Sequence, residues 1–496
     1  MSELIKSDLI VNFLILLAFR LAGPWLVSEI PSHRVNTWRN ALLILTNLEF
    51  LSPNIWVFSV LASIQLVSLR TRETDNSVRY ALLLCAVPVV RMAIPGLGLV
   101  NYLFELNYPR LLSLVLLMPV FFSAEFHSEK PAMSLTDKLL VAFVILRLLL
   151  DFRGTTLSNG IRGIFDTTVD TFLPYWVISR SIRNISQIRM TLLALVTTSL
   201  VLALAGGFEY VKHWLLYFSI GPHWGIDLRH LYLARADSLR ATASMQSPIS
   251  LGYLMVIALA SWHYLATTRS DPPRKRLIPL ILAGGLFVTL SRGPWVGMLV
   301  FMIIYTLTGQ GGFGKLLKLG FYTLALSPLV FIIPGGEKII NIMPFIGHSE
   351  QEDITYRQEL MHNAWIVAQR NFLFGSVDYL SAPELQAMVQ GQGIIDIVNT
   401  YLGEMLHYGL IGVCLFAGIF LSALRELASI RLATAIDAQM DNLRRTLLAT
   451  MVAIMVIIVS VSPVDMIEQL YLIITALSVA LARLVRNPPP TKVIPA

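Results

Sequence analysis

The chain of 496 residues is 55% hydrophobic, only 14% charged, and carries a formal net charge of +7. A soluble protein would have about a quarter of its residues charged, whereas a bilayer disfavours them because a charge at its centre costs several kcal/mol. The composition therefore predicts an integral membrane protein. The basic residues are scattered over short loops, which argues against a nucleic-acid-binding patch.

Apolar runs that could cross a membrane recur along the whole chain. A spanning helix needs about 20 mostly apolar residues, and the candidate runs are 9–27, 41–69, 78–93, 109–124, 135–151, 162–180, 188–208, 248–267, 276–291, 294–308, 316–333, 397–423, 445–462 and 466–485. We expect the 41–69 run to be divided at Ser52-Pro53-Asn54. The predicted fold is an all-α polytopic membrane protein, with residues 1–496 as one membrane domain of about 12–14 transmembrane helices.

Positive charge in short loops predicts the orientation. If the basic loops are cytoplasmic, the positive-inside rule places both termini inside and two long loops, 209–247 and 334–396, in the periplasm. The tail 486–496 is proline-rich and is expected to be a disordered cytoplasmic segment. Segment 422–445 mixes charged and apolar residues at helical spacing, which favours a helix on the cytoplasmic membrane surface. The basic residues concerned are Arg70, Arg72, Arg79, Arg180, Arg183, Arg189, Arg274, Lys275, Arg276, Lys315, Lys318, Arg444, Arg445, Arg483 and Arg486.

The second long loop contains an amphipathic stretch, residues 356–375. Leu360, Ala364, Val367 and Phe372 recur near helical spacing, and Asn371 and Gly375 are placed to close the helix. We expect this helix to lie along the membrane–water boundary. It could be only a lid or anchor, or it could also contribute to function through Arg357.

The stretch "TLSRGPWVG" places Arg292 between two apolar runs. Pro294 suits the first position of a helix, where its missing N–H costs nothing, and Ser291 or Gly293 can cap that helix. A helix starting here directs free N–H groups and the positive end of its dipole toward the arginine. This combination predicts an anion site.

Two further helix starts are predicted at the same face. Arg235 and Arg240 precede Ser247-Pro248, a cap followed by proline, and either Asp396 or Asn399 can cap the helix in 397–423. Several arginines and helix N-termini on one side predict a site for a doubly charged anion such as a lipid diphosphate, because the guanidinium fork matches phosphate oxygens. The alternative for each arginine alone is that it extends to lipid headgroups.

Other charged residues lie nearer the interiors of apolar runs. Arg20, Arg91 and Arg147 are in costly positions that suggest function. Arg91 could bind substrate, or could form a buried pair with a carboxylate such as Asp151. The sequence contains no Walker loop, HExxH or GxSxG motif, and its two cysteines are far apart, so we expect no cofactor and no metal ligand set.

The ordered combination "RATASMQSPISLGY", "TLSRGPWVG" and "YRQELMHNAWIVAQRNFLFGSV…DIVNTYLGEMLHYGLIGVCLF" resembles the bacterial O-antigen ligase/polymerase family, over roughly residues 238–420. The resemblance implies a GT-C-like inner-membrane protein that moves glycans from undecaprenyl diphosphate at the periplasmic face. Arg240, Arg292 and Arg357 would then hold the diphosphate. Ligases carry a His-Asn pair where this chain has Val398-Asn399, which favours an exopolysaccharide or capsule polymerase.

The implied reaction is an inverting, metal-independent glycosyl transfer in which arginines stabilise the leaving diphosphate. Asp396 is the first candidate for the base and Glu404 the second, although Asp396 could equally be only a helix cap. Asn399 would orient a sugar hydroxyl, and Tyr401 belongs to the same motif. The expected partners are the lipid-linked oligosaccharide, membrane lipid and other polysaccharide-assembly proteins. A ligase, a lipid-linked sugar transporter and a non-catalytic scaffold are the alternatives.

Overall fold

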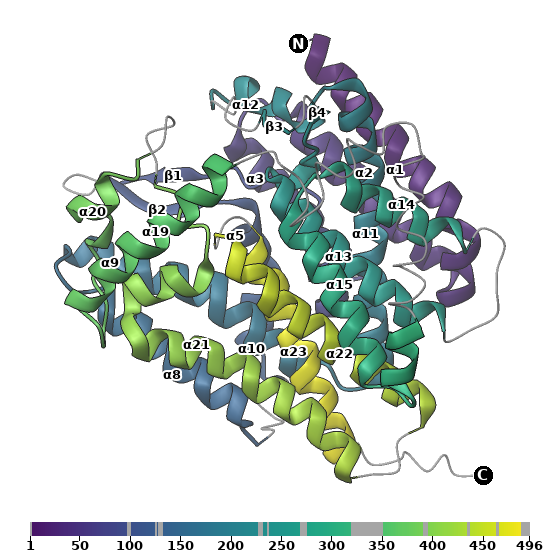
Figure 1. Ribbon diagram of the computed structural model, residues 1–496. Helices are drawn as coiled ribbons and strands as arrows, with labels where there is room; N and C mark the ends of the chain where they lie inside the picture. The colour runs from purple at the N-terminus through teal and green to yellow at the C-terminus, as the bar shows by residue number, and fades with distance from the viewer. Residues whose placement is uncertain are drawn as a thin grey trace.

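The computed structural model describes residues 2–96, 101–124, 126, 132–226, 232–235, 238–267, 275–318, 351–389, 395–433, 437–462 and 466–487. Over these residues the protein is a bundle of helices (Figure 1). The described strands form two short antiparallel hairpins, β1 (Met92–Pro95) with β2 (Tyr102–Leu106) and β3 (Ala234–Arg235) with β4 (Ser238–Leu239). The predicted all-α polytopic architecture is confirmed.

The first half of the chain contains α1 (Ser2–Glu29), α2 (Ser32–Leu51), α3 (Ile55–Leu69), α4 (Asn76–Leu83), α5 (Tyr108–Leu112), η1 (Ser113–Leu117), α6 (Met118–Phe121), α8 (Leu135–Leu150), α9 (Leu157–Asp166), η2 (Thr167–Phe172), α10 (Leu173–Ser181) and α11 (Ile185–Lys212). The turns η1 and η2 are π-helical, and each is followed two residues later by a proline, Pro119 or Pro174. Proline cannot donate to the preceding turn, which interrupts the α-helical ladder there.

The second half contains η3 (Leu216–Ser219), α12 (Ile220–His223), η5 (Ala243–Met245), α13 (Pro248–Ala266), α14 (Leu277–Val288), α15 (Arg292–Leu307), α19 (Gln351–Arg370), η6 (Tyr379–Ser381), α20 (Pro383–Gln386), α21 (Thr400–Ala433), α22 (Ala438–Ile457), η7 (Ile458–Ser460) and α23 (Ile467–Arg486). Helix α21 is bent at Gly409, whose φ of 68° and ψ of −166° are not helical. Glycine can adopt this backbone conformation without steric cost.

Among the described residues, six helices are long and apolar enough to cross a membrane: α1, α11, α13, α21, α22 and α23. Shorter apolar helices are found at α3, α5–α6, α14 and α15. In the most apolar 18-residue stretch of α11 and of α23, 83% is buried inside the protein, compared with 44% in α1 and α21. The first pair therefore forms the centre of the bundle and the second pair its periphery. The predicted run 316–333 and the tail after Asn487 lie largely or wholly outside the described residues.

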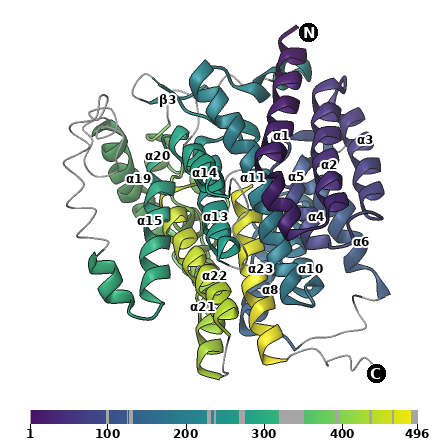
Figure 2. The same ribbon diagram turned by 90° about the vertical axis from the view of Figure 1, so that its right-hand side faces the viewer.

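The two ends of the bundle differ. One end, which we call the hairpin end, carries the β3–β4 hairpin, α12, α19 and α20, and the start of α1 packs beside η3 there (Figures 1 and 2). The C-terminal residues of α23 lie at the opposite end, where Arg483 donates to the carbonyls of Ser179 (2.7 Å) and Ile182 (2.8 Å). The prediction that both termini share one face is therefore wrong.

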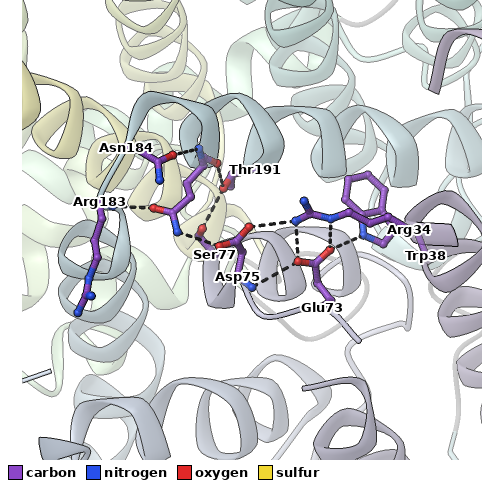
Figure 3. A network of polar contacts seen from close by, with 9 residues as sticks. Arg34, Trp38, Glu73, Asp75, Ser77, Arg183, Asn184 and Thr191 are labelled. Carbon is purple, nitrogen blue, oxygen red and sulfur yellow. Dashed lines mark hydrogen bonds and ion pairs between the residues drawn. The ribbon is translucent and has the colours of Figure 1, made fainter. Parts of the chain in front are cut away.

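A network of ion pairs connects three segments at the opposite end (Figure 3). Arg34 binds Glu73 at 2.6 Å and Asp75 at 3.0 Å, and Trp38 donates to Glu73 at 2.8 Å. Gln187 at the start of α11 donates to Asp75 at 2.8 Å. Several of the basic residues that predicted the orientation also lie at this end. Arg180 contacts Asp137, Arg189 contacts Glu29, and Arg445 donates to the Tyr305 carbonyl.

Two predicted segments differ from the structure. The run 78–93 is not one helix, because α4 ends at Leu83 and the chain continues irregularly into β1. Pro88 lies within the run and explains why it is not one helix, since proline disfavours helix interiors. Segment 422–445 is not one surface helix: α21 continues to Ala433, and α22 starts at Ala438. The predicted break in 41–69 is confirmed, and Asn54 caps α3 by accepting from the N–H groups of Trp56 and Val57.

Candidate functional site

A short turn joins α14 to α15 and forms the centre of the candidate site. Residues 288–291 include Leu290 with a φ of +49°, a left-handed conformation that is uncommon for leucine. Helix α15 starts at Arg292, so Pro294 is its third residue and not its first as predicted. Ser291 precedes the helix but does not cap it. Arg292 therefore lies within the first helical turn, whose N–H groups have no partner inside the helix.

Arg235 at the end of β3 and Arg240 directly after β4 both contact this turn. Arg235 donates to the Leu290 carbonyl at 2.7 Å, and Arg240 donates to the Thr289 carbonyl at 3.2 Å and to the Ser291 hydroxyl at 2.9 Å. Arg235 and Arg240 are therefore brought to the turn that Arg292 follows, whereas Arg357, which was also expected to hold the diphosphate, lies on α19. Ser247 caps α13 as predicted, accepting from the Ile249 N–H at 3.3 Å.

A segment between α22 and α23 connects this turn to Asp396. A Cβ atom on Gly293 would lie 2.8 Å from the Ser460 hydroxyl oxygen, so the start of α15 and η7 are in close approach. Two residues further on, Ser462 donates to the Asp396 carboxylate. Between them, the Val461 carbonyl accepts from the Thr400 hydroxyl at 2.8 Å. Residues 460–462 thus lie between the first turn of α15 and the first turn of α21.

Asn399, and not Asp396, caps α21. Its side-chain oxygen accepts from the Leu402 N–H at 3.2 Å, while the Asp396 carboxylate accepts from Ser462. The carbonyl of Asp396 also accepts from the Tyr356 hydroxyl at 3.2 Å. The interpretation of Asp396 as the helix cap is therefore wrong, and its carboxylate lies in the contact zone between α19, α21 and residues 460–462.

The predicted amphipathic helix is α19. Leu360, Ala364 and Val367 are buried in a small cluster with residues of α20 and α21. Phe372, predicted on the same face, is 39% exposed and lies beyond the end of α19 at Arg370. The N–H of Gly375, with a φ of +65°, bonds back to the Asn371 carbonyl and closes this segment. Arg357 is exposed on α19 next to Tyr356, so it lies at the hairpin end beside the Asp396 region.

Two predicted binding residues lie apart from the arginine turn. Arg91 is exposed beside β1, so the alternative of a buried pair with Asp151 is wrong; Asp151 instead accepts from Tyr408 at 3.1 Å. Tyr401 donates to the Met455 carbonyl at 3.4 Å between α21 and α22.

The sequence suggested a special role for Arg147 but did not reveal its partners. Arg147 lies 3.4 Å from Glu468 and donates to Thr171 and Tyr408, both at 3.2 Å. Glu404 is near enough to interact electrostatically with Arg147. One of its carboxylate oxygens is buried with no hydrogen-bond partner among the described residues. Glu404 therefore belongs to this cluster between α8, η2, α21 and α23, one helical turn from Thr400.

The fold and this site define a multi-pass membrane protein with arginines gathered at a helix start at one end of the bundle. A family model described as O-antigen ligase matches residues 277–417, which contain Arg292, Arg357 and Asp396. This match supports assignment of the chain to the O-antigen ligase/polymerase family and confirms the resemblance seen in the sequence. A search of curated proteins finds no match.

Proposed function

We propose that this protein is a glycosyltransferase that polymerises undecaprenyl-diphosphate-linked oligosaccharide repeat units. The product would be an exopolysaccharide, a capsule or an O-antigen. The observation that carries the proposal is the convergence of Arg235, Arg240 and Arg292 on the turn that opens α15. The family assignment supports lipid-linked oligosaccharide and membrane lipid as the substrates.

The arginines would act on the leaving group. Negative charge on the diphosphate grows as the glycosidic bond breaks, so cations fixed in advance stabilise the transition state more than the ground state. Arg240 is held in direction by the Thr289 carbonyl and the Ser291 hydroxyl. Arg292 adds its own charge at the helix N-terminus, where the dipole also favours an anion. The arginines thus supply the positive charge that a metal ion supplies in other glycosyltransferases.

Asp396 is the base that the geometry favours. The acceptor hydroxyl must lose a proton as it attacks the anomeric carbon, and a carboxylate near the site can take it. Ser462, which donates to Asp396, is two residues from Ser460, which is close to Gly293 at the start of α15, and this supports Asp396 as the base. Glu404 lies about 6 Å further along the α21 axis from Thr400 and beside Arg147. We therefore keep Glu404 as the second candidate, with Asn399 and Arg357 as residues that contact the sugar or the diphosphate.

The proposed orientation places the hairpin end in the periplasm of a bacterial inner membrane. Its support is the collection of basic loop residues at the opposite end, which the positive-inside rule assigns to the cytoplasm. This orientation places the start of α1 on the periplasmic side. Labelling of a single cysteine introduced at Ser2 with a membrane-impermeant thiol reagent, in a variant without Cys85 and Cys414, tests this directly.

A ligase that passes a glycan to another acceptor is the second candidate, because the matching family is described as O-antigen ligase. The presence of Val398 next to Asn399, where ligases are expected to carry histidine, favours the polymerase. The decisive experiment uses the purified protein in vesicles with a diphosphate-linked oligosaccharide as the only substrate. A ladder of multiples of the repeat unit supports the polymerase. Transfer that requires a second, non-diphosphate acceptor supports the ligase, and no transfer with either contradicts the proposal.

A further inference from the structure

Glu209 is a fully buried carboxylate that the proposed reaction does not use. It lies one turn before the end of α11, the central helix of the bundle, and none of its surface is exposed. A buried carboxylate is costly unless hydrogen bonds satisfy its oxygens. An ionisable residue buried inside a membrane protein suggests a functional role.

The partners of Glu209 are backbone groups from two separate segments. One carboxylate oxygen accepts from the Leu216 N–H at 3.0 Å, and the other accepts from the N–H groups of Thr242 (2.9 Å) and Ala243 (2.8 Å). Ala243 has a φ of +46°, a conformation that alanine rarely adopts. The carboxylate therefore bonds to a backbone segment in a sparsely populated conformation, of the kind that persists only where the surrounding structure fixes it.

This segment directly follows Arg240. The N–H of Ala241 donates to the Val288 carbonyl at 3.1 Å, and Arg240 itself binds Thr289 and Ser291. Helix α11 also supports the same junction through Gly206, because a Cβ atom there would lie 3.4 Å from Ala241. Residues 240–243 are thus fixed by Glu209 at their C-terminal end and by the 288–291 turn along their length.

We propose that Glu209 is a positioning residue that fixes the direction of the Arg240 guanidinium toward an incoming diphosphate. This inference rests on the proposed function in that the diphosphate is the anion. Glu209 contacts backbone only and acts through Arg240. The requirement is for two acceptor oxygens: glutamine has one and would turn an amide N–H₂ toward a backbone donor. Aspartate keeps both oxygens, but its side chain is one methylene shorter, so the oxygens lie farther from the backbone N–H groups.

The experiment measures binding of inorganic pyrophosphate to the purified full-length protein by isothermal titration calorimetry. The variants are Glu209→Gln, Arg240→Ala and the double variant. We expect each single substitution to raise the Kd for pyrophosphate about tenfold and the double variant to be no worse than Arg240→Ala alone, because residues that act as a unit are not additive. If Glu209 had only a structural role, Glu209→Gln would raise the Kd for pyrophosphate by the same factor in the wild-type protein and in the Arg240→Ala variant.

The matched control is Glu426→Gln, which alters another buried carboxylate at the opposite end, where Glu426 accepts from Thr136 at 3.0 Å. Its Kd for pyrophosphate should be unchanged.

If Glu209→Gln does not fold, Glu209→Asp is measured in the same cycle, with a smaller loss of affinity expected. Additive effects, or an unchanged Kd in Glu209→Gln, would overturn the positioning role. The binding cycle needs no turnover, so an inactive wild-type protein contradicts the proposed function alone, whereas wild-type protein that does not bind pyrophosphate contradicts both.

Discussion

Arginine side chains play different parts in the ion-pair network at the opposite end and in the arginine turn at the hairpin end. In the network, Arg34 bonds to the carboxylates of Glu73 and Asp75 (Figure 3). At the turn, the described contacts of Arg235 and Arg240 include backbone carbonyls of residues 289–290. A pair of side chains ties loops together, whereas an arginine bonded to backbone takes its direction from the shape of the turn. Substitutions in the network should therefore affect stability, and substitutions at the turn should affect activity.

The largest loss of activity is expected from Arg292→Ala and Arg240→Ala. Removing a cation that stabilises a transferring or leaving phosphate group costs about 10³-fold in rate, so kcat/KM with the lipid-linked donor should fall by this order. Arg292→Lys should recover little, because a lysine ammonium cannot make the two parallel bonds of a guanidinium. Rates are measured in vesicles, and thermal unfolding in detergent checks that the fold is retained. Wild-type rates in either alanine variant would remove the arginines from the mechanism.

A smaller loss is expected from Asp396→Asn, which keeps the size of the side chain and its bond with Ser462 but removes the basicity. General base catalysis contributes about 10²-fold or more, so kcat should fall by this factor while pyrophosphate binding is unchanged. Glu404→Gln is the comparison, with a smaller expected effect. If Glu404→Gln lowers kcat more than Asp396→Asn does, Glu404 becomes the first candidate for the base and Asp396 the second.

Close packing behind the turn gives the third prediction. Gly293→Ala would place a Cβ atom 2.8 Å from the Ser460 hydroxyl, so the start of α15 or Ser460 must move. We expect about a tenfold loss of kcat/KM, since small displacements of catalytic groups are costly. Ser460→Ala removes the opposing atom, and the double variant should regain most of the activity. Gly284→Ala in α14 is the control, because no described atom outside its own helix and chain neighbours lies within 4 Å of the Cβ atom that alanine would add.

The arginine turn could be predicted from sequence because its signals are local. An arginine, a glycine and a proline between two apolar runs indicate a helix start, and Ser247-Pro248 and Asn399 marked two further starts. Glu209 gave no such signal, since its partners are backbone N–H groups of distant segments and any residue could supply them. Residues 460–462, which connect Gly293 to Asp396, also gave no local signal, because this connection arises from tertiary packing. The prediction of one helix over 78–93 from hydropathy was also wrong, because an apolar run can be buried without being a helix.

The smallest effect on activity is expected from the network, where the largest effect falls on stability. Arg34→Ala would leave Glu73, which is 2% exposed, buried without its cation, and breaking such a pair costs about 3 kcal/mol. Arg39→Ala on the same helix is the matched control: Arg39 bonds only its neighbour Asn40 among the described side chains, so the expected change is within about 0.5 kcal/mol. Unfolding in detergent measures both. The kcat of the folded Arg34→Ala protein should equal the wild-type value, because the network lies at the far end of α11 from Glu209. A fall in kcat would mean that the two ends of the bundle are coupled.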